Sequence, residues 1–193
     1  MDRSCVHKRS SARGAAAVEF ALVLMLLLTL ALPVIDYARA IQANTILINI
    51  TREGASQASR GAQLDRQKSQ AIMNALAATT PPLTMATRGM IYITEVEGKK
   101  EGGVITNVVK AQYKWANGSY ADKDSALWAC SSWEGDGKCN VTGEPVVGLM
   151  ANQLAAGEAI YVVESYYHFD ALLSGLDLGV ALLPEVLYSR TVF

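Results

Sequence analysis

The residue with the clearest chemistry in this chain is Glu19, because its carboxylate lies inside a strongly apolar run. The run covers residues 15–35, and Glu19 is its only charged side chain. A helix of this length, at about 1.5 Å per residue, matches the hydrocarbon core of a bilayer, which is about 30 Å thick. A charge at the centre of such a helix costs about 3 kcal/mol to insert. We therefore expect Glu19 either to pair with a cationic group or to lie at the headgroups as a helix-start residue.

Cys130 and Cys139 are a second pair of residues with defined chemistry. They lie in a loop rich in Ser, Gly, Asp and Lys. In an oxidising compartment the two thiols are expected to form a disulfide, and two free, partly buried thiols are the alternative. Closing so short a loop would contribute about 3 kcal/mol in the chain-entropy model.

Signals for catalysis are weak. The chain contains neither a Gly-x-Ser-x-Gly nucleophile elbow nor a Walker A loop. His7 and His168 are its only histidines, which is too few for a zinc site even with the thiols. Asp122 and Asp124 lack the rest of a calcium-binding loop. We therefore expect no enzyme, no catalytic residue, no metal and no cofactor.

Four aromatic residues in the C-terminal half raise the question of an exposed recognition patch. Core packing is the stronger expectation for at least half of them. They are Trp115, Tyr120, Trp128 and Trp133.

The elements that position these residues begin with a basic leader, residues 1–14, whose net charge is +3. The whole chain carries −1, so the remainder carries −4, a balance that does not indicate nucleic-acid binding. Lys and Arg beside a membrane-spanning run favour the cytoplasmic side. We therefore expect residues 15–35 to cross a membrane once, with the N-terminus in the cytoplasm and the C-terminal head exported.

A helical pattern continues beyond the apolar run. We expect one helix from near Ala15 to about Ser59, with residues 36–62 as its extension and Gly54 as a weak point. Its apolar stripe recurs at intervals of three, four and seven residues. The stripe consists of Ala38, Ile41, Thr45, Ile48 and Ala55.

Four charged residues lie on this extension. Asp36 and Arg39 share one helix face and are expected to mark the exit from the membrane. Arg52 and Glu53 are expected either to dock neighbouring subunits, to hold the head on the helix, or to form a solvated face.

The rest of the chain, residues 63–193, predicts a compact head. A second helix over residues 64–78 should end at the sequence Thr-Thr-Pro-Pro that follows it. In the strand expected over 104–115, Val109 should share a face with Ala111 and Tyr113, and Gln112 should lie on the other. Antiparallel strands packed on the long helix make the expected fold class α+β. The expected strands cover residues 90–97, 104–115, 159–169 and 185–193, with a polar turn at 98–103.

Three motifs in the N-terminal part carry a resemblance to a known family. They are GAAAVEFAL at residues 14–22, DYAR at 36–39 and REGA at 52–55. Together they resemble the TadE-like minor pilins, or pseudopilins, of tight-adherence (Flp-type) pili. A basic leader that ends in Gly, with Glu five residues later, is also similar to the processing site of type IV prepilins. The size of the head implies a minor pilin, and both TadE and TadG-like members remain open.

The resemblance implies that a membrane prepilin peptidase cuts between Gly14 and Ala15. The new amino group would lie one helical turn from Glu19, and the amine of a neighbouring subunit is the expected partner for that carboxylate. Glu19 and Phe20 would then act in assembly. The implied partners are the peptidase, other pilin or pseudopilin subunits, the inner-membrane assembly platform and the membrane itself. The mature protein would reside in the inner membrane and then in the extracellular pilus.

Two other classes of protein remain as alternatives. The sequence Ala38-Arg39-Ala40 fits a signal-peptidase site, which would give a secreted protein. The second alternative is a signal-anchored periplasmic binding or sensor domain that does not polymerise. The mature N-terminus distinguishes them, because it would be Ala15 in a pilin, Ile41 in a secreted protein and uncut in an anchored one.

Overall fold

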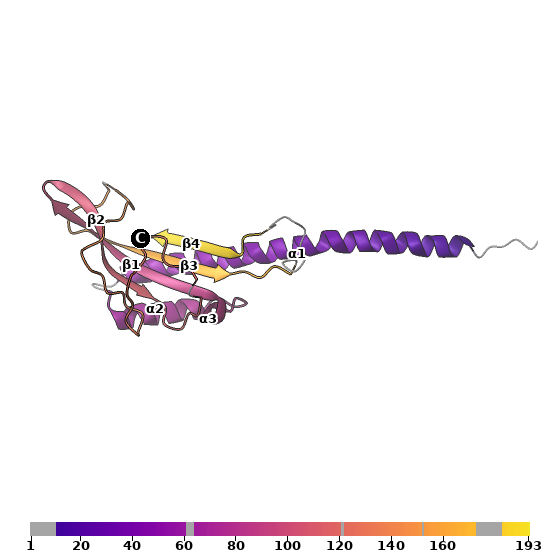
Figure 1. Ribbon diagram of the computed structural model, residues 1–193, viewed down its shortest axis with the longest axis horizontal. Helices are drawn as coiled ribbons and strands as arrows, with labels where there is room; N and C mark the ends of the chain where they lie inside the picture. Colours follow the sequence, from indigo (N-terminus) through magenta and orange to yellow (C-terminus); the bar gives the residue numbers. More distant parts are fainter. Residues whose placement is uncertain (1–10, 61–63, 121, 152, 173–182) are drawn as a thin grey trace, which may run out of the picture.

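A computed structural model describes residues 11–60, 64–120, 122–151, 153–172 and 183–193 of the chain, with side chains from Gly14 onward. Most of the predicted leader, including Cys5 and His7, therefore lies outside the described residues. The elements are one long helix, two shorter helices and one sheet (Figure 1).

Helix α1, Ser11–Ser59, is continuous over 49 residues and confirms the predicted long helix. Its N-terminal half projects alone from the rest of the molecule (Figure 1). An 18-residue window in this helix has a mean hydropathy of 2.6, and none of that window is buried in the fold. By length and composition α1 is able to cross a membrane. Pro33 lies inside the helix without ending it.

The C-terminal half of α1 packs on the head through a different face from the one expected. Three residues of the predicted stripe, Ala38, Ile41 and Thr45, are exposed, whereas Ile48 is half-buried and Ala55 is fully buried. Helix α1 carries two stripes of small and apolar residues with the same spacing, and sequence spacing alone does not show which one is buried. The buried stripe consists of Asp36, Ala40, Ala43, Leu47, Ile50, Gly54 and Ala58.

Four antiparallel strands form a single sheet in the order β2-β1-β3-β4, which confirms the α+β class. The strands are β1 Gly89–Glu101, β2 Val104–Lys114, β3 Ala159–His168 and β4 Val186–Val192. The polar turn expected at 98–103 is shorter than predicted, because β1 continues to Glu101. Gly102 and Gly103 alone make the connection, with φ of 56° and 88°, as a two-residue hairpin requires.

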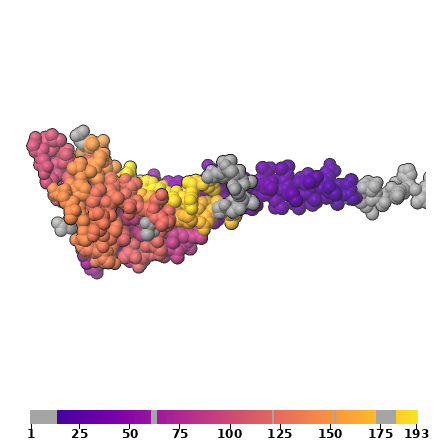
Figure 2. Space-filling model, viewed as in Figure 1, coloured from indigo at the N-terminus to yellow at the C-terminus, as the bar shows by residue number. Residues whose placement is uncertain are grey.

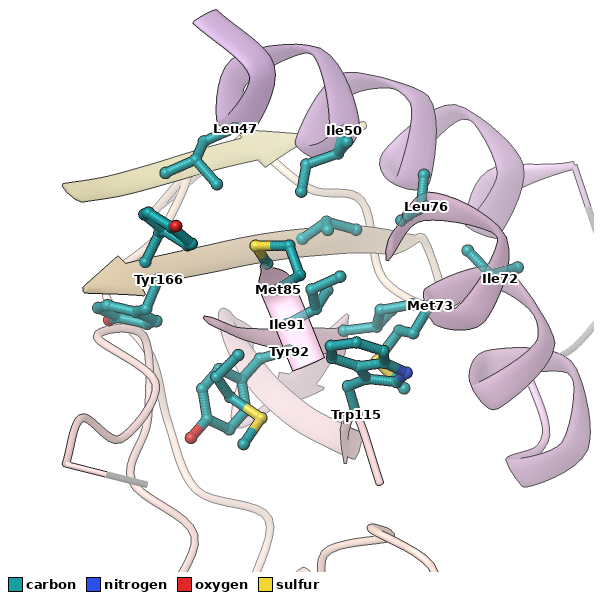
Figure 3. Packing of buried hydrophobic residues seen from close by; sticks show 14 of the residues in the cluster. Leu47, Ile50, Ile72, Met73, Leu76, Met85, Ile91, Tyr92, Trp115 and Tyr166 are labelled. Carbon is teal, nitrogen blue, oxygen red and sulfur yellow. The ribbon is translucent and has the colours of Figure 1, made fainter. Parts of the chain in front are cut away.

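The larger core lies between the sheet and the helices (Figure 3). Helix α2, Arg66–Ala78, begins where Asp65 accepts a hydrogen bond from the Lys68 amide at 2.7 Å. A short helix, α3 Met85–Arg88, precedes β1 and was not predicted. Leu47 of α1, Met73 of α2 and Ile91 of β1 meet in this core and are fully buried.

A second, smaller core covers the opposite face of the sheet. Val147 and Leu154, from the irregular chain between β2 and β3, pack there against the sheet. The sheet therefore lies between a helical layer and a layer of loops, and β3 is buried along both faces.

The expected alternation along β2 is wrong because a register shift interrupts it. The pairing with β1 shifts between Glu95 and Val96, so one residue of β2 is left over. Val109 consequently packs in the second core, away from Tyr113. Gln112 is not solvated but fully buried, and it donates hydrogen bonds to Thr94 Oγ1 at 3.1 Å and to the Trp128 carbonyl at 3.0 Å.

Candidate assembly surface

The predicted processing and assembly residues lie on the projecting part of α1 (Figure 2). Gly14, Ala15, Glu19 and Phe20 are all exposed. Among the described residues, none forms an ion pair with Glu19. A Cβ added at Gly14 would meet nothing within 4 Å, so the fold of one subunit does not require glycine there.

Asp36 and Arg39 join α1 to the head. The Asp36 carboxylate is buried, accepts the Leu172 amide at 2.9 Å, and lies 3.1 Å from the Arg39 guanidinium. That guanidinium also stacks 5.5 Å from the centre of the Phe169 ring. The pair therefore fixes residues 169–172, which follow β3, against the helix at the first residue beyond the apolar run.

Arg52 and Glu53 are exposed and line an open groove beside the end of α2. Gly54, next to them, is buried. A Cβ there would lie 2.7 Å from Leu76 Cδ1 and 3.2 Å from Val163 Cγ1. Gly54 is thus a point of close approach between α1, α2 and β3, and the helix continues through it. The groove is lined by Ile46, Asn49, Ile50, Arg52, Glu53 and Thr79.

The outer face of α1 extends the apolar surface of the projecting half. Ile41 is 53% exposed and lies with Ala38 and Thr45 on the side of the helix turned away from the head. An exposed isoleucine at regular helical spacing with other small or apolar residues is suited to packing against another helix. This outer stripe is available for contact with a neighbouring molecule.

Polar contacts that sequence reasoning missed fix α1 to the sheet edge. Thr51 is fully buried, and its hydroxyl lies 3.0 Å from both Ser189 Oγ and Thr191 Oγ1 of β4. It also donates to the Ile48 carbonyl. These hydroxyls join the C-terminal half of α1 to the edge strand β4.

The structure joins Cys130 and Cys139 in a disulfide, with Cα atoms 6.0 Å apart. The loop they close is also held from α2. Arg66 forms ion pairs with Glu134, at 2.6 Å, and with Asp136. Gln70 donates to the Asp136 carbonyl at 3.1 Å. The disulfide therefore belongs to a loop that rests on α2.

Glu164 is a fully buried carboxylate that sequence reasoning overlooked. It accepts hydrogen bonds from Ser125 Oγ, from the Ala126 amide at 3.1 Å and from the Tyr188 hydroxyl at 2.7 Å. Tyr188 is 38% exposed; partial burial, followed by the hydrogen bond to Glu164, raises its pKa. Burial, together with the nearby Glu164, also raises the pKa of Tyr166 to about 12. The available signal was that Glu164 is the only carboxylate in a strand whose other residues are mostly apolar or aromatic.

The remaining candidates take structural positions. Trp115 and Tyr120 are buried in the larger core, and Trp133 packs on Tyr92 with ring centres 6.0 Å apart. His168 pairs with Asp170 at 3.0 Å. Within the part of the chain that the structure describes, no group of three or more His, Cys, Asp or Glu side chains is placed to hold a metal.

Residues 14–56 match the model of the TadE-like protein family. The match covers the projecting half of α1 and most of its contact with the head, and it confirms the family resemblance over that segment. It associates the chain with Tad pili. No curated protein and no solved structure matches the chain significantly.

Proposed function

We propose that this protein is the precursor of a minor pilin of a tight-adherence pilus, cut after Gly14 by a prepilin peptidase. After cleavage it is a single-pass protein of the inner membrane with its head in the periplasm. It then assembles with other pilin subunits through α1. It acts as a subunit and carries out no chemical step of its own.

The observation that carries this proposal is the bare N-terminal half of α1. Its side chains from Gly14 to Ile35 are exposed apart from the half-buried Pro33, and this is the segment in which the TadE-like match begins. Lipid covers such a surface in the membrane, but outside the membrane only other apolar helices do so. The exposed stripe around Ile41 continues this surface along the head. A helix bundle formed by several subunits would cover both parts.

The fold argues against the secreted alternative. Helix α1 runs without interruption through residues 38–40, and Ala40 is buried in the head core. A cut after Ala40 would separate the Asp36 carboxylate from the Leu172 amide that it accepts. The mature protein would lose a contact that fixes the segment after β3 on the helix.

The outer stripe of α1 provides the test. Ile41→Lys places a charge in the proposed subunit contact, and Gln42→Lys places the same charge on the adjacent exposed residue as a control. Both variants should fold and reach the membrane, because neither side chain is buried. We expect Ile41→Lys to reduce strongly the amount of this protein in sheared surface pili, and Gln42→Lys to leave it near the wild-type level. Equal incorporation of both variants would contradict the proposed contact.

A further inference from the structure

The boundary between α1 and the head offers a second contact with the membrane. Residues 15–35 span about 31 Å as a helix, close to the hydrocarbon thickness of about 30 Å. Asp36 is the next residue, so its carboxylate lies at the depth of the headgroups when the apolar run spans the bilayer. This step rests on the membrane anchorage proposed above.

Leu172 is fixed at that depth by the fold. Its amide donates to the Asp36 carboxylate at 2.9 Å. The preceding turn is held by Asp170, which pairs with Arg88 of α3 at 2.6 Å and with His168 at 3.0 Å. These contacts leave the Leu172 backbone little freedom to move away from α1.

The side chains at this level are apolar and exposed. Leu172 is 59% exposed, and Tyr37, one residue beyond Asp36, is 60% exposed. A tyrosine next to the end of a spanning helix is typical of the aromatic belt at the membrane interface.

We propose that Leu172 and Tyr37 form a lipid-contacting surface, which holds the edge of the head against the membrane interface. The occupant is the bilayer rather than another protein because the surface is continuous with the apolar run of α1 and lies at headgroup depth. The head is then attached at two points, the spanning helix and the Leu172 turn. This double attachment restricts how the head swings before the subunit is extracted into a pilus.

Spin-label accessibility in nanodiscs tests the contact. The full chain carries Cys5→Ser and keeps the Cys130–Cys139 disulfide. A single spin label is attached at Leu172→Cys. Each nanodisc contains one copy of the protein in a mixture of neutral and anionic lipids. Leu26→Cys, in the apolar run, is the lipid reference. Val146→Cys, which replaces a 66% exposed valine of the loop layer, is the water reference. Tyr37→Cys is a second site on the proposed surface.

We expect the ratio of collisions with oxygen to collisions with a water-soluble nickel chelate to be several-fold higher at Leu172 and Tyr37 than at Val146. Values at both sites equal to that of Val146, with Leu26 in lipid, would overturn the contact and leave the anchor intact. If the collision ratios at Leu172, Tyr37 and Leu26 all equalled that of Val146, the membrane anchor itself would be overturned as well. If Leu172 became shielded only in discs with two copies, a second copy of the chain would be the occupant, and the membrane proposal would be wrong.

Discussion

Glu19 has no charged partner among the described residues of one chain, whereas the proposed assembly supplies one. It lies on the bare part of α1. Inserting one carboxylate costs about 3 kcal/mol, which a dozen large apolar side chains of the same run outweigh. Its presence is therefore not explained by insertion, and an amine on a neighbouring subunit is the partner that the proposed function supplies.

Glu19→Ala should leave insertion and cleavage unchanged and should abolish or strongly reduce pilus production. The substitution removes the insertion cost but also removes the charge that pairs with the Ala15 amine of another subunit. Val18→Ala, at an adjacent exposed position, is the matched control and should assemble normally. Membrane fractions and sheared pili from the same cells measure both effects. Wild-type pili in the Glu19→Ala strain would show that Glu19 is only a helix-start residue.

Tyr188 gives the head a defined response to alkaline pH. Its pKa in the folded state is raised above the ordinary value of 10.0 by burial and by its hydrogen bond to Glu164. Above pH 10 the unfolded chain loses this proton while the folded chain keeps it, so the free energy of unfolding falls as pH rises. We expect the decline above pH 10 to be shallower in Tyr188→Phe.

At neutral pH, Tyr188→Phe should also lower the free energy of unfolding by about 1–3 kcal/mol, because the buried Glu164 loses a hydrogen-bond donor. Denaturant titrations of the full chain in detergent from pH 7 to 11 measure both changes. Tyr37→Phe, at an exposed tyrosine of α1, is the control and should leave the free energy of unfolding unchanged. An unaltered alkaline slope in Tyr188→Phe would exclude Tyr188 as a source of the response.

Among the elements, the disulfide loop is held both covalently and by ion pairs. Replacing Cys130 and Cys139 by serine should lower the free energy of unfolding by about 2–3 kcal/mol, the value expected for so short a closed loop. Membrane insertion should not change, because the loop contacts α2 and the sheet rather than the spanning part of α1. Thermal unfolding with and without reductant measures the loss. Free thiols on correctly exported wild-type protein would rule out the bond.

The elements differ in how well the sequence predicts them. The end of α1 near Ser59 and the four strands follow from helical and alternating patterns, and the structure places them within a few residues of those patterns. The buried face of α1 does not follow, because the stripe through Ala43 and Leu47 has the same period as the stripe through Ile41 and Thr45. The second face of the sheet is covered by irregular chain. The sequence of that chain has no helical or alternating pattern that would predict its packing on Val96 and Val162.

The candidate site shows the same division. Gly14 and Glu19 are found from local motifs, because a leader, a small residue and an apolar run are adjacent in the sequence. Thr51 and Glu164 act through partners more than 20 residues away, so their environments depend on the tertiary fold. The role of Asp36 as a buried acceptor for Leu172 likewise required the position of the chain that follows β3.

At the scale of the whole molecule, the protein is a compact head with a bare helical rod (Figure 2). The head covers α1 only from Asp36 onward, and the rod is left to lipid or to other helices. The groove lined by Arg52 and Glu53 and the outer stripe around Ile41 lie on the part of α1 that the head supports. A head with an exposed apolar helix fits a subunit that first resides in a membrane and later packs in a helical bundle.

The identity of the mature N-terminal residue tests the central claim most directly. Intact-mass analysis and N-terminal sequencing of the protein extracted from membranes of its native host require no variant and no assembly assay. Cleavage after Gly14 predicts a chain that begins at Ala15, and a strain with Gly14 replaced by a bulky residue should retain the full leader. A mature chain that begins at Ile41, or one that keeps its leader in the wild type, would contradict the account of a processed pilin.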